Sequence, residues 1–423
     1  MFKLLRSART VRRGRDPAGP RVGRYLHLLK RTEPVRSSIP RPYALTACFL
    51  IAFVFADRQS LMGRESVPPG DCDHLGQWQA QASEAISLGQ LDEAARLLER
   101  VTTCRPDSGE AWWRLGTVAY DRGEYEHALQ AFRRLTELWP GYGPAYLFTG
   151  LALFQRGDYE GAFAEIRRAN RLGVGDAKIA KLGAYYEVLS LVVLSRFEQA
   201  DSFLPWIINA EPENPKTHEL VGMTVLRIAS LPEDLDADRR EMARHIGRAV
   251  SLGQMGALEE ARLEFEGFFR KFRDVPHAHY VFGVLLLQLD RDEAVKEFEA
   301  ELERDPAHLP SLLRLALEYK RRNQLDSAQH YAEKSLTVAP DSPAATSILG
   351  QIKLEQGDVE TAIHFLERAV RLAPEHPKLH LLLAQAYARA RRVEEANRER
   401  EIYQRLSEEA RARGEAPEAA VEP

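Results

Sequence analysis

Histidines, acidic residues and cysteines approach one another along the sequence at two places. Residues 71–74 read Asp-Cys-Asp-His, the side chains of a metal site, but no second cluster supplies the other ligands that a zinc centre needs. His277 and His279 flank Ala278 at the start of a predicted helix, where residues two apart point to different faces. The sequence therefore predicts no metal at either place, and no cofactor.

The motifs of common enzyme classes are missing from the sequence. We find no P-loop, no His-Glu-x-x-His, no Gly-x-Ser-x-Gly and no pair of Cys-x-x-Cys motifs. Residues 173–176, Gly-Val-Gly-Asp, fall in a predicted turn and lack the rest of a phosphate-binding pattern. Repeats fill about residues 75–412 and leave no room for a separate catalytic domain. We therefore expect a protein that is not an enzyme.

The chain has three cysteines, Cys48, Cys72 and Cys104. Cys72 lies just before the first predicted pair of helices, and Cys104 ends the second helix of that pair. In an antiparallel pair, the start of one helix lies beside the end of the next, which brings these two thiols together. In an oxidising compartment Cys72 and Cys104 would form a disulfide that holds the terminal repeat. The alternative is two unrelated small apolar residues.

The N-terminal segment combines a basic stretch with an apolar run. Residues 1–42 contain 12 Lys and Arg residues against Asp16 and Glu33, and the apolar run extends from Tyr43 to Ala56. This run is shorter than the roughly 20 residues of a membrane-spanning helix but matches the core of a signal peptide. We expect an export signal that is cleaved, or an uncleaved membrane anchor with the repeats outside the cytoplasm. A buried or spurious segment remains an alternative.

The charge of the chain is unevenly distributed. Its net charge is −4, and the excess of ten basic residues in 1–42 leaves −14 for the other 381 residues. Binding to phosphates needs a basic face, so we expect no nucleic-acid partner. The chain is 44% hydrophobic and 28% charged, the composition of a globular protein.

A 34-residue spacing recurs along the chain. It separates Ala94, Ala128 and Ala162, then Ala294, Ala328, Ala362 and Ala396; it also separates Pro106 from Pro140, and Pro306, Pro340 and Pro374 from one another. A fixed period of this length indicates stacked copies of one small unit. Gly116, Gly150 and Gly350 fall in the middle of predicted helices, where glycine costs about 1 kcal/mol against alanine. We therefore expect a neighbouring helix to pass too close for a side chain.

The second unit, residues 109–142, carries the fullest pattern of residue types. It has Trp112, Leu115, Gly116, Gly123, Tyr125, Ala128, Phe132 and Pro140 in order. This pattern resembles the tetratricopeptide repeat (TPR) family, whose unit is a helix–turn–helix of 34 residues. The resemblance implies an all-α fold, a right-handed superhelical α-solenoid of eight to nine stacked repeats.

The spacing also predicts the organisation of the chain. We expect a leader in residues 1–56, a linker in 57–74, regular repeats in 75–176 and again in 276–412, and a disordered tail in 413–423. In 177–275 the pattern becomes irregular, with a four-residue insertion in the fourth unit. One extra helical hairpin is expected around residues 218–229, followed by a solvated acidic loop and an insertion near 230–241.

The family resemblance also implies a binding surface. Repeats of this family bind peptides or proteins along a concave groove lined by the first helix of each unit, at positions 2, 5, 9, 12 and 13. Transferred to this sequence, the candidate partner-binding residues are Glu110, Trp113, Thr117, Tyr120, Leu147, Leu151, Phe154, Leu313, Lys320 and Arg321. The apolar members either line a groove or pack against the next repeat, and the basic cluster of residues 320–322 either binds an acidic segment or is a solvated face.

Together these observations predict an exported or membrane-anchored scaffold that binds a protein or peptide partner. The alternative function is a structural subunit of a cell-envelope assembly or export complex. Stoichiometric co-purification with other subunits would favour that alternative.

Overall fold

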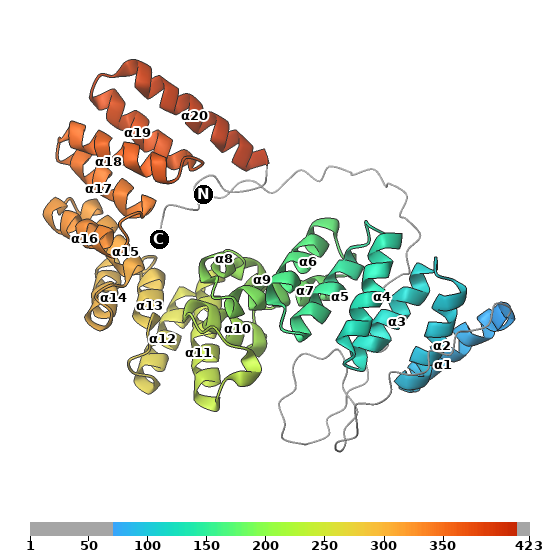
Figure 1. Ribbon diagram of the computed structural model, residues 1–423. Helices are drawn as coiled ribbons and strands as arrows, with labels where there is room; N and C mark the ends of the chain where they lie inside the picture. The colour runs from blue at the N-terminus through green and yellow to red at the C-terminus, as the bar shows by residue number, and fades with distance from the viewer. Residues whose placement is uncertain (1–70, 413–423) are drawn as a thin grey trace. The chain divides into compact units, whose positions relative to one another are not determined.

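The computed structural model describes residues 71–412, which form twenty α-helices and, within that range, no strand (Figure 1). The chain divides into two compact units, residues 1–211 with 228–237 and residues 212–227 with 238–423. Each unit is described by itself. The expected all-α fold of stacked helix–turn–helix repeats is confirmed, and nine hairpins occur in the described range with α10 as one additional helix.

The first unit begins with a short 3-10 turn, Asp71–His74, and continues as antiparallel hairpins. Its helices are α1 (Leu75–Ser87), α2 (Leu91–Cys104), α3 (Gly109–Asp121), α4 (Tyr125–Leu138), α5 (Gly143–Gln155), α6 (Tyr159–Leu172), α7 (Ala177–Val193), α8 (Phe197–Asp201) and α9 (Leu204–Ala210). Each of α1 to α7 packs on the next helix, and α3 with α5 and α5 with α7 also touch directly. First helices of successive repeats are therefore in contact.

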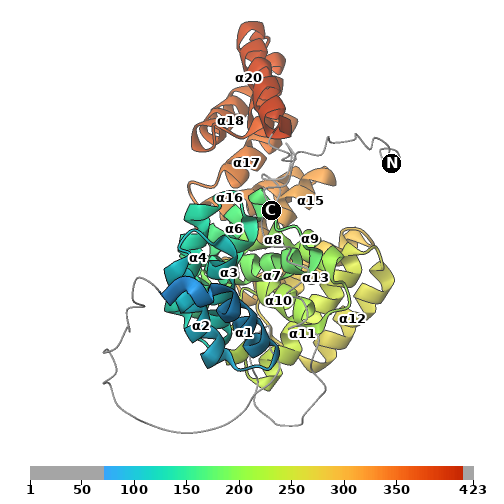
Figure 2. The same ribbon diagram turned by 90° about the vertical axis from the view of Figure 1, so that its right-hand side faces the viewer.

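The second unit contains α10 (Pro215–Val225), α11 (Ala237–Gln254), α12 (Leu258–Lys271), α13 (Ala278–Leu286), α14 (Arg291–Arg304), α15 (Leu309–Arg321), α16 (Leu325–Val338), α17 (Pro343–Glu355), α18 (Val359–Leu372), α19 (Pro377–Arg389) and α20 (Val393–Ala412). Helices α17 to α20 stack in chain order in both views (Figures 1 and 2). Most residues of α20 are exposed. A mostly polar terminal helix suits the end of a repeat stack, which has no further neighbour.

The glycines in the middle of helices lie where the paired helix approaches, as expected. A Cβ atom added to Gly116 would lie 2.5 Å from the Phe132 ring, and one added to Gly150 would lie 2.6 Å from Ile166. Gly350 is similar, at 2.8 Å from Leu366. These distances are below van der Waals contact, so the helical hairpin closes only around glycine.

A residue with positive φ ends the first helix of most hairpins. Gly123 and Gly357 have φ of 77° and 82°, a region that glycine enters without steric cost. At the same place in their repeats, Asn323 and Arg391 adopt φ of 58° and 60°. The turn geometry is therefore kept even where the sequence lacks the glycine signal.

The irregular middle of the chain differs in part from the expectation. The four extra residues lengthen α7, which has 17 residues where α3 and α5 have 13. The second helix of this hairpin is broken into α8 and α9 just before Pro205, which has no N–H for a continuous helix.

The hairpin expected around residues 218–229 is wrong, because that segment contains the single helix α10. A 3-10 turn, Pro232–Asp234, follows α10, and Leu235 is buried within the otherwise exposed acidic stretch. Helix α11 already begins at Ala237, inside the expected insertion. The leader, most of the linker and the tail at 413–423 lie outside the described residues, so these expectations are not tested here.

Candidate functional site

Six of the expected groove residues are buried inside the repeat stack. They are Trp113, Tyr120, Leu147, Leu151, Phe154 and Leu313. The expectation that these side chains are open to a partner is wrong, and the alternative of packing against the next repeat holds. The physical reason is that consecutive first helices touch one another, which covers the positions that a wider superhelix would expose.

Aromatic contacts show how Trp113 and Phe154 are used. The Trp113 ring lies 5.0 Å from Phe148 and 5.9 Å from Phe132, measured between ring centroids. Phe154 lies 4.9 Å from Tyr186 of α7 in an edge-to-face arrangement. Edge-to-face pairs of this kind add to the stabilisation from burial. The aromatic N-terminal region is therefore core.

The accessible part of the predicted site lies along one face of α3. Glu110 is exposed, and Arg114, Thr117 and Asp121 are half-buried. Residues three, four and seven apart share a helix face, so we call these four residues the α3 surface. The Arg114 guanidinium donates to the Glu110 carboxylate at 2.8 Å and to the Ser83 hydroxyl of α1 at 2.6 Å.

A cavity of about 220 Å³ opens beside the α3 surface. It is lined by Gln79, Ala80 and Ser83 of α1, Leu98 and Val101 of α2, and Glu110, Ala111 and Arg114 of α3. Sequence reasoning missed Gln79, Ser83 and Arg114 as site residues. A signal for the first two existed, because Gln79 and Ser83 stand 34 residues before Trp113 and Thr117.

Asp121 has an unusual electrostatic environment. Burial raises the pKa of this carboxyl group to about 6. Its neighbour Tyr120 also has a raised pKa, first because of burial, then because of Tyr125, with a smaller contribution from Asp121. The end of α3 is therefore a place where a carboxylate is kept partly away from water.

The basic cluster predicted in the second unit is largely neutralised. The Lys320 Nζ donates to Gln351 at 2.9 Å and lies 3.5 Å from a Glu355 carboxylate oxygen. Arg322 pairs with Asp292 at 2.7 Å. Arg321 is exposed. The interactions of Lys320 and Arg322 within the repeats favour a role in joining neighbouring hairpins.

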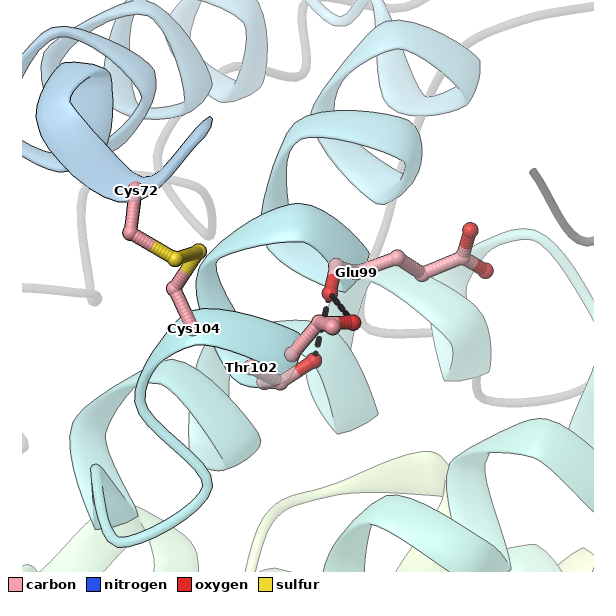
Figure 3. Close-up of a disulfide and its surroundings, with 5 residues drawn as sticks. Cys72, Glu99, Thr102 and Cys104 are labelled. Atoms are coloured by element: carbon pink, nitrogen blue, oxygen red, sulfur yellow. Dashed lines mark hydrogen bonds between the residues drawn. A yellow bond between two sulfur atoms is a disulfide. The ribbon is translucent and has the colours of Figure 1, made fainter. Parts of the chain in front are cut away.

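Cys72 and Cys104 are joined by a disulfide in the structure, with their Cα atoms 5.8 Å apart (Figure 3). Cys72 belongs to the turn before α1, and Cys104 ends α2, the arrangement expected of an antiparallel pair. The backbone carbonyl of Glu99 accepts hydrogen bonds from the hydroxyl groups of Thr102 and Thr103, one turn along α2. The bond ties the first hairpin together beside the cavity.

The two histidines near residue 278 have separate partners. The Nδ1 atom of His279 lies 2.6 Å from the Glu297 carboxylate, whereas Nδ1 of His277 lies 2.8 Å from Nε2 of His308. His277 precedes α13 with a positive φ of 65°. In residues 71–412, no group of three or more His, Cys, Asp or Glu side chains is arranged to hold a metal ion.

Residues 43–56, the candidate export signal or anchor, lie outside the described residues. Of the helices that the structure does describe, none combines the length and apolar character needed to cross a membrane.

The fold and site define a class of protein, the helical-repeat solenoid built from hairpins of about 34 residues. Residues 80–143 and 121–177 match the family model for the tetratricopeptide repeat. Residues 321–398 match the model named anaphase-promoting complex, cyclosome, subunit 3. The chain belongs to the tetratricopeptide repeat family.

Several solved structures resemble the chain at low sequence identity. MamA from Desulfovibrio magneticus RS-1 is 24% identical, with 41% of this chain and 96% of that chain covered and a TM-score of 0.36. The Cut9–Hcn1 hetero-tetramer of the APC/C is 13% identical, with 79% and 88% covered and a TM-score of 0.39. Yeast Tom70 is 14% identical, with 79% and 85% covered and a TM-score of 0.34. No curated protein sequence matches the chain.

Proposed function

We propose that this protein is a non-catalytic scaffold that binds a protein or peptide partner at the α3 surface and the adjoining cavity. The observation that carries the proposal is the cavity between α1, α2 and α3, lined by polar side chains where the first helices of two repeats meet. It is the accessible remainder of the surface that TPR proteins use. The absence of catalytic motifs from the sequence supports a binding role, and the net charge of −14 after residue 42 argues against a nucleic-acid partner.

Position-specific photocrosslinking in cells tests this proposal. A photoreactive amino acid at Glu110 or Thr117 should label one discrete partner, because both residues lie on the α3 surface. The same amino acid at Glu99, an exposed residue of α2, is the control and should label no such partner. Equal labelling from Glu99 and Thr117, or none from any of the three positions, would reject the α3 surface as the binding site.

We also propose that the repeats act outside the cytoplasm, after export or while anchored by residues 43–56. Two features support this location: the apolar run after a basic stretch, and the Cys72–Cys104 disulfide, which persists in oxidising compartments. N-terminal sequencing of the protein from fractionated cells separates the alternatives. A start close to residue 57 indicates cleavage, and an intact leader in the membrane fraction indicates an anchor. An intact leader in the cytosolic fraction would contradict the proposed location.

A further inference from the structure

We infer that Asp121 recognises a cationic side chain, a lysine or an arginine, in the partner segment that binds the α3 surface. This inference rests on the proposed function, and it adds the chemical class of the ligand. Asp121 is the last residue of α3, three turns beyond Glu110 on the same face.

The first argument is that the Asp121 carboxylate has no hydrogen bond or ion pair to any other described residue. Nearby acidic residues do have such partners. The adjacent Arg122 is held by Asp92 at 3.0 Å and by Glu124 at 2.8 Å. Glu126 is paired with Arg156 at 2.7 Å. The fold therefore satisfies the neighbouring carboxylates and leaves Asp121 unpaired.

The second argument is burial. Asp121 is half-buried, and burial is the only cause that raises its pKa. A carboxylate that has lost part of its hydration without gaining a partner is unfavourable, and a cation placed beside it recovers that lost interaction. A site of this kind discriminates strongly, because a neutral or anionic group in the same place leaves the carboxylate unsatisfied.

The third argument is an independent unsatisfied group on the same face of α3. The indole Nε1 of Trp113 has no hydrogen-bond acceptor, although the side chain is only 2% exposed. Trp113 lies four residues before Thr117, which itself lies four residues before Asp121. Unpaired buried polar groups are rare in folded proteins. Two of them on one helix face indicate a surface that is completed by a ligand.

The remaining chemistry of the α3 surface also favours a cation. The Thr117 hydroxyl donates its proton to the backbone carbonyl of Arg114 at 2.9 Å, which leaves its oxygen as an acceptor. Glu110 adds a second carboxylate at the exposed end of the surface. The chain after residue 42 carries a net charge of −14, so long-range electrostatics attract a basic segment.

Selection of peptides on the full chain tests the inference. A library of random 12-residue peptides is selected separately against the wild type, Asp121→Asn and Glu99→Gln. The Glu99→Gln variant is the matched control, because it removes one negative charge from an exposed place on α2 in the same unit. We expect peptides selected on the wild type and on the control to share one lysine or arginine position, and that position to lose its preference on Asp121→Asn.

Affinities of the selected peptides then measure the coupling directly. Replacing the shared basic residue by norleucine should weaken binding to the wild type by about tenfold and binding to Asp121→Asn by less than about twofold. Selected peptides that bind the α3 surface without a basic position, or an equal loss on both proteins, would overturn the inference and leave the scaffold function standing. Failure to select any peptide would count against both.

Discussion

The Nδ1 atom of His277 lies 2.8 Å from Nε2 of His308, which links the starts of α13 and α15 across one repeat. The backbone N–H of Ser311 donates to Nδ1 of His308 at 3.3 Å, so the proton of this ring is on Nε2 and is donated to His277. The pair therefore requires both rings to be neutral. A third group, the buried Glu301 carboxylate, accepts from the backbone N–H of His277 at 3.0 Å.

Acid should weaken the second unit through this pair. Burial, and then the nearby His277, lowers the pKa of His308 to about 4, and burial lowers the pKa of His277 despite the opposing charge of Glu301. Because these folded-state pKa values lie below the unfolded value, the unfolded state binds more protons. Stability is present above about pH 6.5 and is lost as the pH falls towards 4, by roughly 1–3 kcal/mol. His308→Asn, which retains a helix-capping side chain, should flatten this pH dependence in urea unfolding. An unchanged profile in the variant would contradict the prediction.

The crossing of α10 and α11 should not tolerate a methyl group. A Cβ atom on Gly222 would lie 1.8 Å from the carbonyl oxygen of Ala243, and one on Gly247 would lie 1.7 Å from that of His218. Backbone atoms cannot move aside as side chains do, so Gly222→Ala should destabilise by about 3 kcal/mol or more.

Gly76→Ala is the matched control for that substitution. Gly76 lies in α1 with no atom within 4 Å of an added Cβ, and there alanine should stabilise the helix by up to about 1 kcal/mol. Thermal unfolding of the two variants followed by circular dichroism measures both effects. Equal melting temperatures would show that the helices separate at little cost.

Removing the aromatic side chains of the former groove candidates should unfold the first unit. Trp113 and Phe154 are 2% and 6% exposed, so Trp113→Ala or Phe154→Ala should each cost about 3–5 kcal/mol. Thr117→Ala, on the same helix but half-buried, should change stability by less than about 1 kcal/mol. Chemical denaturation of the three variants tests this difference. Native-like stability of Trp113→Ala would return that side chain to the groove.

Reducing the Cys72–Cys104 bond should loosen the first hairpin. The bond closes a separation of 32 residues, for which loss of the cross-link corresponds to about 3–4 kcal/mol. Hydrogen exchange should become faster in α1 and α2 after reduction, while exchange in α17 and α18 stays the same. Cys72→Ser should reproduce the effect without reductant. Equal protection of α1 before and after reduction would show that packing alone holds the hairpin.

Asp121→Asn should make the protein more stable at neutral pH. The folded-state pKa of Asp121 is raised above its unfolded value, so its contribution to stability is most favourable below about pH 4 and is lost as the pH rises through about 6. The amide avoids burying a charge and should gain roughly 1–2 kcal/mol at pH 7.5 and little at pH 4. Urea midpoints of the wild type and variant at both pH values measure this. A destabilised variant at pH 7.5 would show that the carboxylate has a partner.

The sequence by itself determined the repeat architecture of this protein. A 34-residue period constrains local structure, because Gly116, Gly150 and Gly350 are tolerated in a helix only where the paired helix passes closely. The same local logic placed Cys72 beside Cys104, since both ends of one hairpin are fixed by its turn. Helices α3 to α6 could therefore be predicted from residue types alone.

Tertiary structure decided which positions on those helices are open. Whether Trp113 or Leu147 faces a partner depends on the distance between first helices of successive repeats, and residue type does not encode this distance. Contact between α3 and α5 buries both side chains, and only the α3 surface remains accessible. The His277–His308 pair and the break before Pro205 also arise outside the repeat pattern, because long-range packing sets them and each repeat has only its neighbours to pack against.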